Sequence, residues 1–87
     1  MTKLVVSSFI SKGTLLVYLD NVQIVEDAQV ITMELEERIE YIIHWFVKGP
    51  PGNSYSITVS SPREAQFQLT RSIGHAGKGL GGFKFRA

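Results

Sequence analysis

A glycine-rich segment near the end of the chain has the residue types that bind phosphate in nucleotide-binding proteins. Residues 77–82 read Gly-Lys-Gly-Leu-Gly-Gly and match the pattern G-x-G-x-x-G. That chemistry requires a helix after the turn, whose N-terminus meets the pyrophosphate, and only five residues follow Gly82. A Walker A loop would need glycine in place of Ile73, and Ser or Thr in place of Gly79. We therefore expect a flexible loop whose glycines are Gly74, Gly77, Gly79, Gly81 and Gly82.

Metal binding and nucleophilic catalysis have few candidate residues. The chain has two histidines, His44 and His75, and no cysteine, so a closed zinc site would have to recruit carboxylates. Neither histidine has partners at ligand spacing, and we expect both to be solvated. The serines lack the accompanying histidine and acid that activate a nucleophile. No metal site and no other cofactor is expected.

The carboxylates gather mainly in one polar corner of the sequence, at Glu34, Glu36, Glu37 and Glu40. Catalysis by a carboxylate pair requires that one member lie in a desolvated pocket, and nothing in this corner predicts one. We therefore expect a protein that is not an enzyme. A small enzyme subunit that uses the glycine-rich segment is an alternative.

Composition is that of an ordinary folded chain. Its 87 residues fit one domain, 1–87, with a single core, and hydrophobic residues make up 44% of them. Nine basic and eight acidic residues give a formal net charge of +1. A nucleic-acid-binding domain concentrates a basic excess on one face, so we expect no nucleic-acid partner.

The sequence leaves the cellular location open. Without cysteine there is no disulfide framework, which slightly favours the cytoplasm, but bacterial periplasmic and cell-surface domains also do without cysteine. No window approaches the roughly 18 apolar residues of a membrane span, and residues 1–6 are too short for a signal peptide. A cytoplasmic and a bacterial periplasmic or cell-surface location both remain possible.

Hydrophobic alternation predicts the elements that carry these residues. Apolar side chains recur at every second position through residues 39–47, 55–59 and 65–69 and, past Arg71, at Ile73, with turn residues between the three runs. A period of two puts alternate side chains on opposite faces of a strand. If residues 49–53 are a hairpin loop, the strands at 39–47 and 55–59 pair side by side. This predicts that Val47 lies opposite Tyr55, Trp45 opposite Ile57 and Ile43 opposite Val59.

Residues 33–48 also permit a helix. Leu35, Ile39, Ile42, Ile43 and Phe46 have helical spacing, and Gly49 with Pro50 would end such a helix. The strand interpretation is favoured because it places Tyr41, Trp45 and Val47 on the face of Ile39 and Ile43. An α+β fold with a helix in this region is the alternative.

Further short strands complete the expected fold. We predict them at residues 4–10, 14–19, 22–25, 29–35 and 83–86, each bounded by turn residues. About seven short strands with turns between them are typical of an antiparallel β-sandwich of immunoglobulin-like type. The fold class is therefore predicted to be all-β.

Apolar residues on the outward face of this sandwich are the best functional clue. If Ile43 and Trp45 point inward, then Ile42, His44 and Phe46 point outward, near Tyr18. We expect this patch, or an exposed strand edge, to contact a protein partner or a second copy. The first strand, Leu4–Ile10, and the last, Phe83–Arg86, are the predicted edges.

A carbohydrate-binding accessory domain is the alternative function. Such modules often have a sandwich fold, but sugar binding requires an aromatic platform in solvent. Most aromatic residues of this chain, Trp45 among them, fall on the predicted core face.

Overall fold

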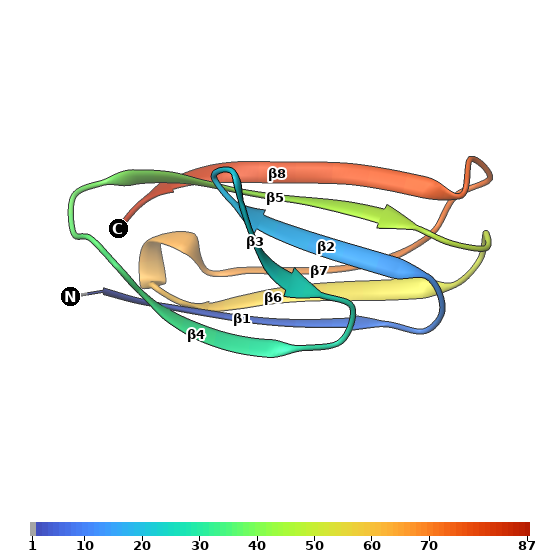
Figure 1. Ribbon diagram of the computed structural model, residues 1–87, viewed down its shortest axis with the longest axis horizontal. Helices are drawn as coiled ribbons and strands as arrows, with labels where there is room; N and C mark the ends of the chain where they lie inside the picture. Colours follow the sequence, from blue (N-terminus) through green and yellow to red (C-terminus); the bar gives the residue numbers. More distant parts are fainter. Residues whose placement is uncertain (1) are drawn as a thin grey trace.

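Eight strands make up most of the chain in the computed structural model, which describes residues 2–87 apart from the side chain of Glu64. The strands and one short 3-10 helix follow one another along the chain (Figure 1). They are β1 (Thr2–Ile10), β2 (Thr14–Leu19), β3 (Val22–Glu26), β4 (Val30–Leu35), β5 (Glu40–Lys48), β6 (Ser54–Ser61), η1 (Arg63–Ala65), β7 (Phe67–Ser72) and β8 (Lys78–Arg86).

The strands form two antiparallel sheets of four strands each. Sheet A has the order β4-β1-β6-β7 and sheet B the order β3-β2-β5-β8. Five of the seven connections cross from one sheet to the other, and only β2–β3 and β6–β7 connect neighbours within a sheet. Alternate side chains of both sheets point into the space between them, where the most deeply buried residues lie. These include Leu4, Val6, Leu15, Val17, Ile43, Val47, Ile57 and Val59.

The predicted all-β sandwich is confirmed, with eight strands in place of about seven. The alternative helix near residues 33–48 is wrong, because β4 and β5 occupy this stretch and Ile43, Trp45 and Val47 share the buried face of β5. In the constant type of immunoglobulin domain the first two strands share a sheet, whereas here β1 and β2 lie in different sheets. The immunoglobulin-like type is not confirmed.

The predicted hairpin between β5 and β6 is wrong. Residues 49–53 carry the chain from sheet B to sheet A, so β5 pairs with β2 and β8, and β6 pairs with β1 and β7. The inward faces were nevertheless predicted correctly, because the two strands point the same residues at each other across the core. The predicted ladder partners that do not pair are Val47 with Tyr55, Trp45 with Ile57, and Ile43 with Val59.

The last strand is longer than predicted, and the glycine-rich loop is correspondingly shorter. Strand β8 begins at Lys78, so the prediction of a loop at Gly79, Gly81 and Gly82 is wrong. Gly74 and Gly77 lie in the link between β7 and β8. Of the two predicted edges, β8 is an edge of sheet B, but β1 is not an edge, because it lies between β4 and β6.

The two sides of the sandwich differ in what lies between their edge strands. We call the side formed by edges β3 and β4 the closed side, because residues 27–29 join these edges directly and bond to both sheets. The Ser8 amide donates to the Gln29 carbonyl at 2.8 Å, and the Leu15 amide donates to Asp27 Oδ1 at 2.9 Å. Residues 73–77 also join edges β7 and β8, at one end of the opposite side. We call this opposite side the open side, because a groove lies between its two edge strands.

Candidate functional site

The free edge of β8 is the first component of the candidate site. The Asp20 amide donates to the Ile42 carbonyl at 2.8 Å, so the backbone of Ile42 points toward β2. Because this direction alternates along an antiparallel strand, Ile43 and Trp45 point toward β8 and bond their partners Phe83 and Gly81. The backbone groups of the intervening β8 residues, Leu80, Gly82 and Lys84, therefore point away from β5. No strand of sheet B lies beyond β8 to pair with them.

The glycines of β8 allow large side chains to pack against its backbone. A Cβ at Gly81 would lie 2.6 Å from Trp45 Cε2, which is inside van der Waals contact. A Cβ at Gly82, on the other face, would lie 2.8 Å from the Ile43 carbonyl oxygen and 2.9 Å from His44 Cβ. Glycine inside a strand often marks such a close approach. The glycines that resemble a loop in the sequence are therefore what allows β8 to pair closely with β5.

A groove of about 440 Å³ runs along the open side, next to this edge. Its lining comes from both sheets and combines aromatic, aliphatic and polar side chains. The lining residues include Trp45, Tyr55, Phe67, Leu69, Arg71 and Leu80. Trp45 itself is only 7% exposed, so its indole forms part of the groove floor and not a projecting platform.

Aromatic rings fill the space between the sheets under the groove. The ring centroids of Trp45 and Phe67 are 5.5 Å apart, and those of Phe67 and Phe83 are 4.9 Å apart. Both pairs are tilted, an arrangement that aromatic side chains favour. Since Phe67 belongs to sheet A while Trp45 and Phe83 belong to sheet B, these contacts join the two sheets.

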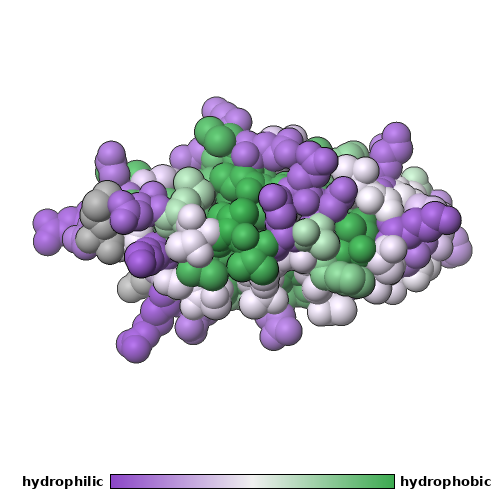
Figure 2. All heavy atoms as spheres, turned by 60° about the horizontal axis from the view of Figure 1, so that its bottom comes forward, coloured by the Kyte–Doolittle hydropathy of each residue, from purple (hydrophilic) through white to green (hydrophobic). Residues whose placement is uncertain are grey.

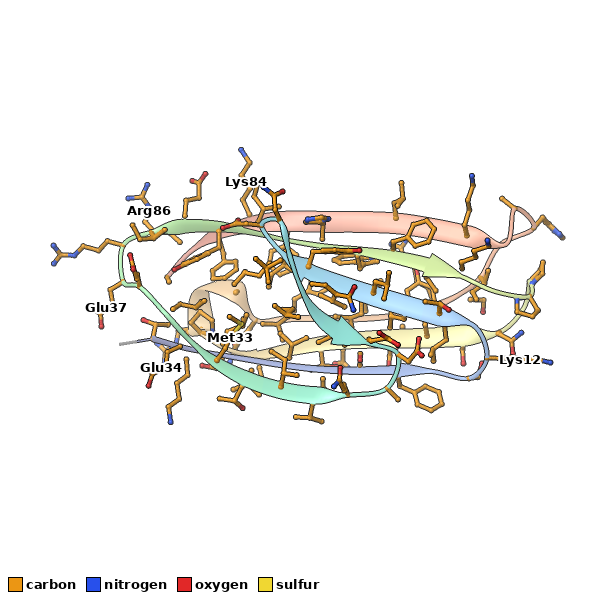
Figure 3. The ribbon with its side chains drawn as sticks, in the orientation of Figure 1. Lys12, Met33, Glu34, Glu37, Lys84 and Arg86 are labelled. Atoms are coloured by element: carbon orange, nitrogen blue, oxygen red, sulfur yellow. The ribbon has the colours of Figure 1, made fainter. Side chains whose placement is uncertain are left out.

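Positive charge lines the open side. Lys78, Lys84 and Arg86 are exposed on the outer face of β8, and Figure 3 shows Lys84 and Arg86 projecting away from the sandwich. Arg71 stands on β7 opposite Tyr55 and lines the groove. Leu80, which is 79% exposed, lies between the charged residues of β8. The edge thus combines unpaired backbone groups, an exposed aliphatic side chain and basic side chains.

The outer face of sheet B holds the four residues predicted to bind a partner. Tyr18 on β2 and Ile42, His44 and Phe46 on β5 all point outward, and Ile42 is 42% exposed. The other three are half-buried by their neighbours. The structure therefore brings the four together on one face, and their binding role stays a prediction.

His44 is more constrained than a solvated histidine. Its ring stacks on Tyr18 with centroids 5.1 Å apart and an interplanar angle of 10°. Its Nε2 lies 2.6 Å from the backbone oxygen of Asp20. His75, by contrast, lies exposed in the link between β7 and β8. The contacts of His44 explain how an imidazole fits on this sheet face without any chemistry at the ring.

Among residues 2–87, leaving aside the side chain of Glu64, no group of three His, Cys, Asp or Glu side chains is placed to hold a metal ion. In the same residues no helix has the length and apolar character needed to cross a membrane. The buried side-chain nitrogen and oxygen atoms of this described part all have hydrogen-bond partners.

No protein-family model, curated protein or solved structure matches this chain. Its function therefore has to be inferred from its own residues.

The groove and its residues escaped prediction. Phe67, Leu69 and Arg71 show the alternation of a strand, but alternation does not say that β7 is an edge or that β8 lies across from it. One sequence signal was available, since Gly79 and Gly81 alternate in the same parity as Phe83 and Phe85. Glycines in core parity within a strand indicate a place where a large side chain packs on the backbone.

Proposed function

We propose that this protein is a non-catalytic binding module, which takes an extended segment of a protein partner as an added strand on β8. The observation that carries the proposal is the row of outward-pointing backbone groups at Leu80, Gly82 and Lys84, next to the groove of the open side. Strand addition at a sheet edge obtains affinity from backbone hydrogen bonds and specificity from alternate side chains.

The partner segment should alternate acidic and apolar residues. On one face its side chains would lie beside Lys78, Lys84 and Arg86, where carboxylates are favourable. On the other face they would enter the groove, over the backbone of Gly81. A strand with this period matches both surfaces at once, because its successive side chains point in opposite directions.

Lysine on a sheet edge also has a protective role, since charged side chains prevent edges from pairing indiscriminately. Lys78 and Lys84 oppose the pairing of β8 with any basic strand, including a second β8. They do not oppose an acidic strand. The charges that protect the edge therefore also select its partner.

The outer face and carbohydrate binding are less well supported. Tyr18 and His44 already stack on each other, which leaves Ile42 as the most exposed member of that patch. A sugar platform requires an exposed aromatic face, whereas Trp45 is 7% exposed. Neither surface offers free backbone groups as the β8 edge does.

Peptide titration tests the proposal. The probes are two peptides of equal length that alternate apolar with acidic residues or apolar with lysine residues. The fluorescence of Trp45, the only tryptophan, reports on the groove. We expect the acidic peptide to change Trp45 emission and to shift the amide signals of β8, and the lysine peptide to do neither.

An edge variant and a matched control make the test specific. Leu80→Pro removes one outward-pointing amide without touching the bonds between β8 and β5, so it should abolish the peptide response. Lys12→Glu changes a charge in the β1–β2 link, outside β7, β8 and the groove lining, and should leave the response intact. Peptide-induced shifts confined to Tyr18, Ile42, His44 and Phe46 would contradict the proposal and assign binding to the outer face.

A further inference from the structure

Charge is divided between two segments of the chain. Residues 22–37 contain five carboxylates and no Lys or Arg, whereas residues 65–87 contain four Lys or Arg residues and no carboxylate. The acidic segment contains β3 and β4, and the basic segment contains β7 and β8. The net charge of the whole chain is only +1, because the positive and negative charges nearly cancel.

The topology turns the division along the chain into two oppositely charged sides. Strands β3 and β4 are the edges of the closed side, and β7 and β8 are the edges of the open side. In Figure 3, Glu34 on β4 lies at the bottom of the view and Lys84 and Arg86 on β8 lie at the top. Glu26 and Glu34 thus lie on the edge strands of the closed side, with Asp27 between those strands, whereas Glu36 and Glu37 lie in the link from β4 to β5. The charged residues of the open-side edge strands are all basic: Arg71, Lys78, Lys84 and Arg86.

Cross-strand neighbours reduce this division without removing it. Lys3 stands opposite Glu34 in sheet A, and Glu40 stands opposite Arg86 in sheet B. Other charges have no opposite charge as their ladder partner. Glu26 pairs with Leu16, Lys84 pairs with Ile42, and Lys78 pairs with Lys48.

Strand direction makes the two sides geometrically compatible. Each sheet has four antiparallel strands, so its two edge strands run in opposite directions. A second copy displaced sideways, without rotation, therefore presents β3 antiparallel to β8 and β4 antiparallel to β7. Both sheets would continue from one copy into the next with their inner faces still inward.

Exposed aliphatic side chains occur on both sides. Val22 and Val30 on the closed side are 63% and 73% exposed, and Leu80 on the open side is 79% exposed. Figure 2 shows apolar surface gathered among polar side chains on the face that brings β4 forward, and Ile24, Ile31 and Met33 are half-buried there. Each side thus has apolar surface as well as charge available for a contact.

We infer that the strand taken up by β8 is β3 of a second copy of this chain, which brings Glu26, with Asp27 next to it, and the rest of the closed side onto the open side of the first. This inference rests on the proposed function and names the partner. The contact is heterologous, so each copy keeps one free side of each kind and assembly continues beyond a dimer. Pairing of two open sides or of two closed sides is disfavoured, because it opposes like charges.

Sedimentation velocity of the wild-type chain is the first test. We expect the sedimentation coefficient to rise with protein concentration at about 10 mM ionic strength, without a limit at the dimer. The rise should be largely lost at about 1 M, where the Debye length falls from about 30 Å to about 3 Å. A chain that stays monomeric at every concentration and ionic strength would overturn the inference.

A charge exchange identifies the sides. Lys78→Glu with Lys84→Glu reduces the net charge of residues 65–87 from +4 to 0, and Glu26→Lys with Glu34→Lys reduces the net charge of residues 22–37 from −5 to −1. Each double variant alone should associate about tenfold more weakly than wild type, while Lys12→Glu should not. An equimolar mixture of the two double variants should recover association. The same mixture should not associate when both double variants also carry Leu80→Pro, because this change removes a β8 amide and leaves the charges unchanged. Association that persists would show that net charge alone drives it, and would overturn the inference.

The peptide titration separates this inference from the proposed function. A monomeric chain whose β8 still binds the acidic peptide overturns self-association and leaves the strand-adding function standing. A chain that does neither overturns both. Association that the Lys78→Glu and Lys84→Glu changes do not weaken would also overturn the inference, because the contact would then lie elsewhere.

Discussion

The closed and open sides of this sandwich hold the two sheets together through different kinds of contact. On the closed side, residues 27–29 pass from β3 to β4 and the backbone of β1 and β2 bonds to them. On the open side, Trp45, Phe67 and Phe83 fill the space between the sheets. Hydrogen bonds fix the first side in a single geometry. Ring packing at the second side leaves a groove and a free edge, and this is where a partner strand can be added.

Disrupting the contacts of the closed side should cause the largest loss in the free energy of unfolding. Asp27 adopts a φ of 56°, which Asp tolerates better than Ala, and its Oδ1 accepts the Leu15 amide at 2.9 Å. Asp27→Ala should lower the free energy of unfolding by about 2 to 4 kcal/mol, because it strains the backbone and leaves that amide without its acceptor. Urea unfolding measures the change. Asp27→Asn keeps an acceptor and the turn propensity, so an equally large loss there would contradict the role of the hydrogen bond.

Disrupting the packing of the open side should cause a smaller loss in the free energy of unfolding. Gly81→Ala places a Cβ against the Trp45 indole, and we expect a loss of about 1 to 3 kcal/mol from overpacking. The matched control is Gly74→Ala, because a Cβ there has no atom within 4 Å. That variant should be neutral or gain up to about 1 kcal/mol through the unfolded state. Equal urea midpoints for the two variants would contradict the packing of Trp45 on β8.

The smallest effect is expected on the outer face. Phe46 is half-buried there, next to Leu16 and Leu80 in the ladders, so Phe46→Ser should cost about 1 kcal/mol of unfolding free energy. Association through the β8 edge should change little. Sedimentation velocity and urea unfolding of this one variant distinguish the two surfaces. Lost association with retained stability would make the outer face the interface, and severe unfolding would place Phe46 in the core.

Alternation in the sequence predicted faces better than it predicted partners. The parity of Ile43, Trp45 and Val47 was correct, because burial alone determines which face of a strand is apolar. The same parity is consistent with two strands that lie side by side and with two that face each other across the core. The choice between them depends on whether residues 49–53 turn back within a sheet or cross to the other one, and apolar periodicity does not record that.

The candidate site was predicted only in part, because its character comes from tertiary contacts. Tyr18, Ile42, His44 and Phe46 could be placed on one face by parity alone. The groove could not, since it depends on β7 and β8 being edges of different sheets. The glycines of β8 have low intrinsic strand preference, and pairing with β5 overrides that preference.

Amide hydrogen exchange along β8 tests the central claim most directly. In dilute protein at high ionic strength, the amides of Leu80, Gly82 and Lys84 should exchange fast, while those of Gly81 and Phe83 should be protected by their bonds to β5. In concentrated protein at low ionic strength, the account predicts that Leu80, Gly82 and Lys84 become protected as well. Fast exchange at these three amides under both conditions, in protein that sediments as an assembly, would contradict strand addition at β8.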